Sequence, residues 1–338
     1  MARYLGDINA RARGLRTHLL APSDLARLAR ANGLTALQRE LSALGLVRSD
    51  APATPAILEH GIRRHAADQM AVLKRWCSDA RGKTLAVIFE DEERRSIQAI
   101  LRGAAQGTAS EVRITGLVPT GALSERALQT LASQPTPADV VRMLVLWNHP
   151  FGAPLIGAVS KPNPSLFEIE VELARTFARR ASARAHEGGK QLVEYVEQVI
   201  DVLNAWSALL HFVERDPSIV DLTFIEGGRW LTREVFGALM SLETLRDVEN
   251  RLAWELRKSA LASAFRGESA DMTELEGAVL RAQIQWQNRS VRIDPTGASP
   301  VIGFAIELRA EVLNLQSIIW GVALQAPSAL IQAEMVVA

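Results

Sequence analysis

The sequence of 338 residues contains a single cysteine, Cys77. One thiol excludes an internal disulfide, although pairing with a second chain stays open, and nothing indicates an oxidising compartment. The N-terminal residues MARYLGDINARARGL lack the apolar core of a signal peptide. No stretch approaches the roughly 18–20 apolar residues that cross a bilayer. We therefore expect a soluble or peripheral protein, most simply cytoplasmic, that does not span the membrane.

Motifs of catalysis and metal binding are also absent from the sequence. Gly82-Lys83-Thr84 is like the end of a phosphate-binding loop, but Cys77 stands where that loop needs its first glycine. The six histidines form neither HExxH nor a zinc-ligand spacing, and GxSxG does not occur. We predict no catalytic residue, no bound cofactor and no metal ligand.

One acidic run could still hold a metal ion. Residues 90–93 read EDEE, which is similar to the magnesium-binding clusters of isoprenoid enzymes. Those clusters need carboxylates that converge from two facing helices, and no second run of similar density occurs. Arg94 and Arg95 follow at once. We interpret the run as one solvated face of a helix.

The composition is that of a folded, helical protein. Hydrophobic residues make up 48% of the chain and charged residues 22%, and good helix formers dominate. Charge balances overall, but residues 1–110 hold 17 Lys or Arg against 11 Asp or Glu. This local excess of +6 is too small to predict a nucleic-acid partner, and scattered surface charge is the simpler interpretation.

A helical segment recurs three times at a period near 109 residues. Ser96, Asn204 and Asn314 lie 108 and 110 positions apart. An acid stands three residues before each of them, and apolar or alanine residues follow at matching offsets. The third copy, in residues 306–325, has apolar residues at steps of four and three, the spacing of one helix face. The acids are Glu93, Asp201 and Glu311, and the apolar face of the third copy is Leu308, Val312, Leu315, Ile319 and Val322.

The repeat predicts an all-α chain of three similar helical domains, at residues 1–115, 116–225 and 226–338. Helices are expected at 58–77, 165–185, 192–213 and 272–287, with breaks at 81–82, 188–189 and 294–300. Residues 150–164 hold four prolines and two glycines, which predicts a loop or extended segment. Residues 111–121 match 218–228 and indicate an extended connector or a single strand. Ser23, Ser124 and Thr232 each precede leucines or other apolar residues at helical spacing, as helix caps do.

One polar pattern and one apolar pattern each leave two interpretations open. Asparagine inside a helix is unfavourable, so the repeated Asn either bonds a neighbouring backbone, which we favour, or lies exposed. Residues 192–213 carry a second apolar row that predicts core packing, with a partner-binding seam as the alternative. That row is Leu192, Val196, Val199, Leu203, Trp206, Leu210 and Val213.

The order of these segments resembles a known family, the C subunit of the bacterial and archaeal V/A-type rotary ATPase, called the d subunit in eukaryotes. The similarity covers the whole chain and is carried by residues 4–15 (YLGDINARARGL), 97–103 (IQAILRG), 167–170 (FEIE), 200–204 (IDVLN) and 307–321. Three positions depart from the family pattern. Ser96 stands where the family usually has Asn, and Trp206 and Gln316 stand where Arg or Lys is common.

The resemblance implies an all-helical funnel of three domains around a pseudo-threefold axis, with a central cavity. It implies a non-catalytic central-stalk subunit that binds the rotor shaft and the membrane proteolipid ring and transmits torque between them. The subunit would be peripheral on the cytoplasmic face of the membrane. A charged interface with the ring, formed by the basic first domain, is a hypothesis.

Two other functions remain open at this point. A helical-repeat scaffold could bind peptides on a concave face, although a period near 109 residues exceeds the roughly 34–47 residues of common helical solenoids. An all-α enzyme could have a site too dispersed to see in the sequence.

Overall fold

The structure, a computed structural model, describes residues 5–48, 50, 52–77, 80–161, 164–211, 222–265 and 272–337. Over these ranges the chain is helical and contains no strand, as the composition predicts. Within the same ranges, no helix combines the length and the apolar character needed to cross a membrane.

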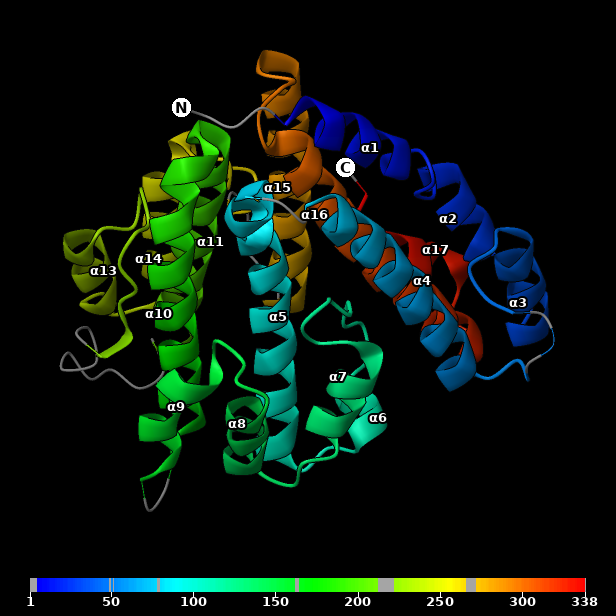
Figure 1. Ribbon diagram of the computed structural model, residues 1–338, viewed down its shortest axis with the longest axis horizontal. Helices are drawn as coiled ribbons and strands as arrows, with labels where there is room; N and C mark the ends of the chain where they lie inside the picture. The colour runs from blue at the N-terminus through cyan, green and yellow to red at the C-terminus, as the bar shows by residue number, and fades with distance from the viewer. Residues whose placement is uncertain are drawn as a thin grey trace.

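Long helices come in three consecutive pairs along the chain (Figure 1). The pairs are α4 (Pro55–Trp76) with α5 (Ala80–Gln106), α10 (Leu166–Ala185) with α11 (Lys190–His211), and α15 (Met272–Ile293) with α16 (Ser299–Ala323). Short helices precede each pair and one follows the last. They are α1 (Gly6–Arg16), α2 (Pro22–Leu28), α3 (Leu34–Ala43), α6 (Ser110–Arg113), α7 (Glu125–Ala132), α8 (Pro137–Leu146), α9 (Gly152–Val159), α13 (Arg233–Met240), α14 (Leu245–Glu255) and α17 (Ser328–Ala333), with single 3-10 turns at His186–Gly188 and Leu256–Lys258.

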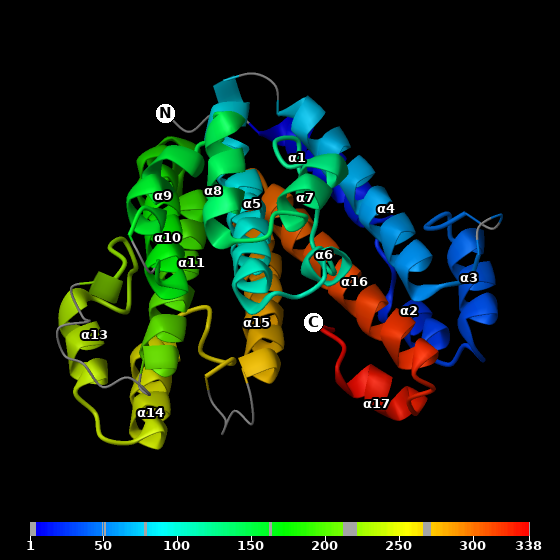
Figure 2. The ribbon, with the colours of Figure 1, turned by 90° about the horizontal axis from the view of Figure 1, so that it is seen from below.

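The last long helix, α16, lies at the centre of the packing. It contacts α15, α4, α1 and α11, and also the short helices α2, α3 and α17. Figure 2 shows α16 running beside α4, with α15 close by. All members of its predicted apolar face are buried, and most of its remaining circumference is buried as well. The helix is therefore a core element on nearly every side.

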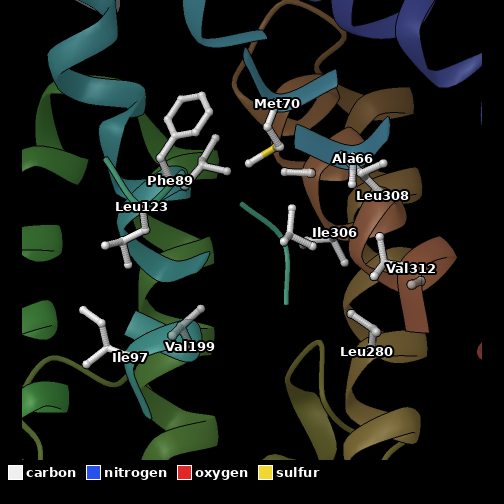
Figure 3. Packing of buried hydrophobic residues seen from close by; sticks show 14 of the residues in the cluster. Ala66, Met70, Phe89, Ile97, Leu123, Val199, Leu280, Ile306, Leu308 and Val312 are labelled. Carbon is white, nitrogen blue, oxygen red and sulfur yellow. The ribbon is translucent and has the colours of Figure 1, made fainter. Parts of the chain in front are cut away.

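A single apolar cluster connects all three long pairs. Met70 of α4, Ile97 of α5, Val199 of α11, Leu280 of α15 and Ile306 of α16 all belong to it (Figure 3). A second, smaller cluster joins the C-terminal half of α11 to α13, α14 and the N-terminal half of α15. The predicted boundaries near residues 115 and 225 thus fall between segments that share one core.

Threonine and serine caps start the helices where the sequence indicates them. The side-chain oxygen of Ser124 accepts the Ala127 N–H at the start of α7, and that of Thr232 accepts the Val235 N–H at the start of α13. These bonds satisfy backbone donors that the first helical turn leaves over. Thr54, Thr136 and Thr244 cap α4, α8 and α14 in the same way. The prediction for Ser23 is wrong, because α2 begins at Pro22 and its cap position is Ala21.

Two predicted irregular segments are different in the structure. Residues 150–164 contain α9, because Pro154 lies in the first turn, where its missing N–H has no partner to lose. Gly152 lets α9 approach α8 closely, since a Cβ there would lie 2.7 Å from the backbone N of Val145. The strand proposed for residues 111–121 is wrong: this segment contains the end of α6, a turn and an irregular stretch. Its match at 218–228 lies partly outside the described residues.

The predicted break at residues 81–82 lies slightly earlier, before Ala80. Gly82 is inside the first turn of α5, where a Cβ would come within 1.6 Å of the Cys77 carbonyl oxygen. Glycine is required here by this close approach of the two backbones. The predicted break at 188–189 is confirmed, and Gly189 has φ of 86°. The break predicted at 294–300 covers only 294–298, because α16 already begins at Ser299 with Pro300 in its first turn.

The second apolar row of α11 is mainly core, as predicted. Leu192, Val196, Val199 and Leu203 are buried, whereas Leu210 near the end of α11 is 48% exposed. Val213 lies outside the described residues. The row therefore begins in the core and ends at the protein surface.

The central place of α16 predicts a large effect of truncating its buried face. Leu308→Ala should lower the free energy of unfolding by about 2–5 kcal/mol, because it leaves a cavity where a side chain with no exposed surface had packed. Leu324→Ala, at a leucine that is 75% exposed, is the matched control and should change it by less than about 0.5 kcal/mol. Urea denaturation followed by circular dichroism measures both. Equal effects of the two changes would contradict the packing described for α16.

Candidate functional site

The acidic run at residues 90–93 is the most densely charged part of the protein interior. Every side chain from Glu90 to Arg94 is buried, so the prediction of a solvated helix face is wrong. The run lies in the middle of α5, where helices from elsewhere in the sequence surround it. Burial of so many charges is tolerated only when each one is paired. The pairing partners come from α5 itself, from α10, α11 and α16, and from two loops.

Asp91 is the centre of this ionic cluster and has no exposed surface. Its carboxylate accepts hydrogen bonds from Arg94 at 2.8 Å and from Tyr195 Oη at 2.8 Å. Arg95 and Arg309 approach it at 3.2 Å. Burial opposes ionisation of Asp91, but the three guanidinium groups outweigh it and hold the pKa of the carboxyl well below its usual range. The same burial, beside the Asp91 charge, raises the pKa of the Tyr195 hydroxyl, which stays protonated and donates.

Arg309 joins α16 to this cluster. Its guanidinium binds Glu92 as well as Asp91, and its side chain is 8% exposed. Burial alone would lower the pKa of Arg309, but the two carboxylates raise it above its ordinary value. A buried arginine held by two acids is costly to form and far more costly to break, because removing it leaves both acids unpaired.

The two ends of the acidic run bind further segments. Glu90 pairs with Arg180 at 2.7 Å and with Arg184, both on α10. Glu93 accepts the Thr120 hydroxyl at 2.8 Å, and its other oxygen lies 3.5 Å from His149 Nε2. The cluster therefore ties α5 to α10, to α11 through Tyr195, to α16 through Arg309, and to the loop before α7.

The chemistry of this cluster is structural. Each acid of the run faces arginine, tyrosine, threonine or histidine, and no group of His, Cys, Asp and Glu among the described residues could hold a metal ion. The prediction of no catalytic, cofactor or metal residues stays a prediction. What sequence reasoning missed is that EDEERR is a core segment. The only signal was that arginines recur at helical spacing in α10, at Arg180 and Arg184.

The repeated asparagines have the backbone role that we favoured. Asn204 donates to the Ile225 carbonyl at 2.8 Å, and its own oxygen accepts the Ile225 N–H at 2.9 Å. Asn314 makes the same pair of bonds with Val336, at 3.0 and 2.7 Å. A side-chain amide has one donor side and one acceptor side, so it can replace a backbone partner on both. Ser96, the third member, is buried on α5, but its shorter side chain has no amide to offer.

The repeated acids hold the loops that lead into short helices. Asp201 accepts backbone N–H groups of Arg229, Trp230 and Leu231, just before α13. Glu93 accepts from Thr120, before α7, and Glu311 accepts the Leu20 N–H at 2.5 Å, before α2. Three equivalent acids thus hold three equivalent loops. The third acid is near the end of the chain and its loop is near the beginning.

For two of these acids, the hydrogen bonds to backbone N–H groups do not offset the effect of burial on the carboxyl pKa. Burial raises the pKa of Asp201 to about 6, although three backbone N–H groups oppose the rise. Burial raises the pKa of Glu311 to about 7, opposed only by the Leu20 N–H. Glu311 therefore carries its proton at a higher pH in the folded protein than in the unfolded chain.

A cavity of about 670 Å³ lies between α5, α10 and α11. Its walls are apolar on α10 and α11, with Phe167, Trp206 and Leu210, and polar on α5, with Gln98 and Arg102. Arg102 is held by two bonds to Glu170, at 2.6 and 2.8 Å. Glu276 of α15 also lines the cavity, so all three long pairs contribute to it. An apolar wall that faces a polar wall can receive an amphipathic helix.

Removing the arginine that joins α16 to the cluster should destabilise the protein strongly. Arg309→Met should lower the free energy of unfolding by about 3–5 kcal/mol, because Asp91 and Glu92 lose a buried counter-charge. Arg142→Met is the matched control: Arg142 also binds an aspartate, Asp139, but is 73% exposed, so its loss should cost less than about 1 kcal/mol. Chemical denaturation of both variants tests this. A small effect of Arg309→Met would show that the cluster contributes little to stability.

Glu311 should make stability depend on pH. Because its pKa rises from 4.5 to about 7 on folding, the folded state binds the extra proton between these values. The free energy of unfolding should therefore fall as the pH rises from about 5 to 8, by up to roughly 3 kcal/mol from this group. Glu311→Gln should remove that part of the slope and stabilise the protein at pH 8. Glu334→Gln, at an exposed glutamate of α17's C-terminal end, should leave the slope unchanged, and an unchanged slope in Glu311→Gln would contradict the assignment.

The chain is similar to two curated proteins, both C subunits of A-type ATP synthases. It is 24% identical over 315 residues to the one from Haloquadratum walsbyi, and the match covers 89% of this chain and 86% of that protein. It is 22% identical over 288 residues to the one from Methanosarcina acetivorans, with 83% and 77% covered.

The match to a protein family covers more of the chain than the match to either relative. Residues 8–334 match the family of the ATP synthase (C/AC39) subunit, so the similarity includes all three long pairs and the short helices around them. The predicted resemblance to this subunit and the predicted non-catalytic role are confirmed by this match. The chain belongs to the ATP synthase (C/AC39) subunit family.

Proposed function

We propose that this chain is the central-stalk subunit that links the rotor shaft of a V/A-type ATPase or ATP synthase to its membrane proteolipid ring. It would transmit torque between them and carry out no chemistry itself. The family match over residues 8–334 carries this proposal. A subunit that transmits torque must be stiff. One core shared by all long helices, with an ionic cluster inside it, would supply that stiffness.

The proposal includes three helical units, at residues 1–115, 116–225 and 226–338, arranged as a funnel around a pseudo-threefold axis. The equivalent contacts of Glu93, Asp201 and Glu311 support it, because each acid holds the loop before the short helices of a unit. The first two acids hold the loop of the next unit in sequence. Glu311 holds the loop at Leu20 in the first unit, as a cyclic arrangement requires.

The cavity between α5, α10 and α11 is the proposed place where the shaft is received. Helices of all three units line it, and its largest exposed apolar residue on α11 is Leu210. An amphipathic helix end would place its apolar side on α10 and α11 and its polar side on α5. The subunit would rest on the cytoplasmic side of the ring without entering the bilayer, which agrees with the lack of a spanning helix among the described residues.

The proposal predicts that a charge in this cavity weakens the shaft interaction. Leu210→Glu should reduce affinity for the isolated shaft subunits by roughly 10-fold or more, because a carboxylate would be buried against an apolar partner surface. Leu324→Glu, at an exposed leucine beyond the end of α16, should have little effect. Binding is measured by calorimetry, after circular dichroism has shown that both variants are folded.

Purification of the tagged full chain from its native cells distinguishes the alternatives. Co-purification of shaft and proteolipid subunits supports the central-stalk function. Recovery of unrelated proteins or peptides without these subunits would support a helical scaffold instead. Equal shaft affinity of Leu210→Glu and the unchanged protein would remove the cavity from the proposal but leave the family assignment intact.

A further inference from the structure

The connections within the three long helix pairs lie close together, in the upper part of Figure 1. Gln191, at the start of α11, donates to the Asp294 carbonyl at 3.0 Å, and its side-chain oxygen accepts the Ser299 N–H at 2.7 Å. The α10–α11 connection also approaches α5, since a Cβ at Gly188 would lie 2.6 Å from the side chain of Thr84. Connections that are far apart in sequence therefore meet at one end of the molecule.

Helix α1 packs against the same end. Arg81 of α5 binds Asp7 of α1 at 2.6 Å. Asn9 of α1 donates to the Gly297 carbonyl at 2.9 Å, in the loop before α16. We call this end the connection surface, and we define it by the residues that approach one another there: 7–13, 81–84, 186–191 and 292–297.

The connection surface and the cavity lie at opposite ends of the same long helices. On α5, Lys83 belongs to the connection surface and Arg102 lines the cavity, with roughly 30 Å of helix between them at about 1.5 Å per residue. On α11, Lys190 begins the helix at the connection surface and Leu210 near its end lines the cavity. A protein that links two partners needs two separate surfaces with rigid elements between them, and these helices meet that requirement.

The connection surface is basic around an exposed apolar side chain. Its residues include six Lys or Arg against three Asp or Glu, whereas charge balances over the whole chain. Two of the acids are engaged within the surface, because Asp7 binds Arg81 and Asp294 accepts the Gly297 N–H at 3.1 Å. Ile293 is 86% exposed, more than any other large apolar residue in the described part of the chain. The exposed basic residues come from α1, α5, α11 and α15, and they are Arg11, Arg13, Lys83, Lys190 and Arg292.

We propose that the connection surface binds the cytoplasmic side of the proteolipid ring, with Ile293 in an apolar contact and the basic side chains paired with carboxylates of the ring. An apolar contact surrounded by charged groups is the usual anatomy of a protein interface. The inference rests on the proposed central-stalk function and names the surface that serves it, while the cavity at the other end receives the shaft. A second copy of this chain is a poor occupant, because two surfaces of the same positive charge repel each other.

The proposal changes the hypothesis of a ring interface formed by the basic first domain. Lys190 lies in the second proposed unit and Arg292 in the third, so the basic residues of the connection surface belong to all three units. Folding gathers charges that the sequence distributes over almost its whole length.

Charge reversal at the starts of α5 and α11 tests the ring contact. Lys83→Glu/Lys190→Glu should bind the purified ring, in nanodiscs of zwitterionic phosphatidylcholine, roughly 10-fold more weakly than the unchanged chain, because like charges would face each other. An acid near a helix start suits the helix dipole, so both helices should still form. Arg39→Glu/Arg126→Glu is the matched control, with the same change of charge at exposed arginines of α3 and α7, and should change the affinity by less than about 2-fold.

The outcomes separate this inference from the proposed function. If the unchanged chain binds the ring and the two double variants bind it equally well, the connection surface is wrong and the central-stalk function stands. Failure of the unchanged chain to bind the ring would overturn both. Binding of the unchanged chain to ring-free nanodiscs that contain anionic phosphatidylglycerol, as tight as its binding to the ring, would identify lipid headgroups as the occupant and overturn the proposal.

Ile293→Ser gives a second measurement at the same surface. It should weaken ring binding by about 5-fold or more, because the apolar contact is lost, and leave the affinity for the isolated shaft subunits unchanged. Leu210→Glu should do the reverse, with weak shaft binding and unchanged ring binding. Circular dichroism establishes that both variants are folded. Loss of shaft binding and ring binding together in a folded Ile293→Ser variant would contradict two independent ends.

Discussion

The packing of this protein depends on the pairing of Asp91 with three arginines and a tyrosine in a site without exposed surface. A buried charge is tolerated only where partner groups bind it with good geometry, so the helices that supply these partners must pack against α5 at this site. Tyr195 arrives on α11, and Arg309 arrives on α16. The apolar cluster around them supplies most of the favourable energy of folding, but apolar contacts alone would permit the helices to slide. The ionic cluster determines their register.

A second set of polar contacts joins the long helices to the loops between them. Carboxylates and amides on the long helices bind backbone groups of the loops, so the loops need no sequence similarity to be held alike. This explains why the repeat is clearer in the long helices than in the loops. Ser96 lacks the amide that Asn204 and Asn314 use, but Glu93, three residues before it, still holds the loop before α7 through the Thr120 hydroxyl.

The sequence predicted the helical class, the positions of most long helices and the backbone role of Asn204 and Asn314, because these depend on local periodicity and on residues repeated in register. It did not predict the burial of residues 90–93. The partners that α10, α11 and α16 supply lie about 90 to 220 residues away in sequence, and a run of charges has the same local pattern on a surface as in a core. The strand proposed for residues 111–121 failed because β-branched content favours a strand only where neighbouring strands are present to pack and pair with it. Cavities form between helices whose angles no local pattern encodes, and the one lined by Leu210 was therefore not foreseen.

The central place of α16 has a consequence for the order in which the chain can fold. The helices α1, α2, α3 and α4 all pack against α16, which begins at Ser299. During synthesis, these four helices are therefore made long before α16, and the apolar sides that pack against it stay exposed until α16 is made. Contacts this distant in sequence slow folding and lengthen the time during which exposed apolar surface can bind chaperones.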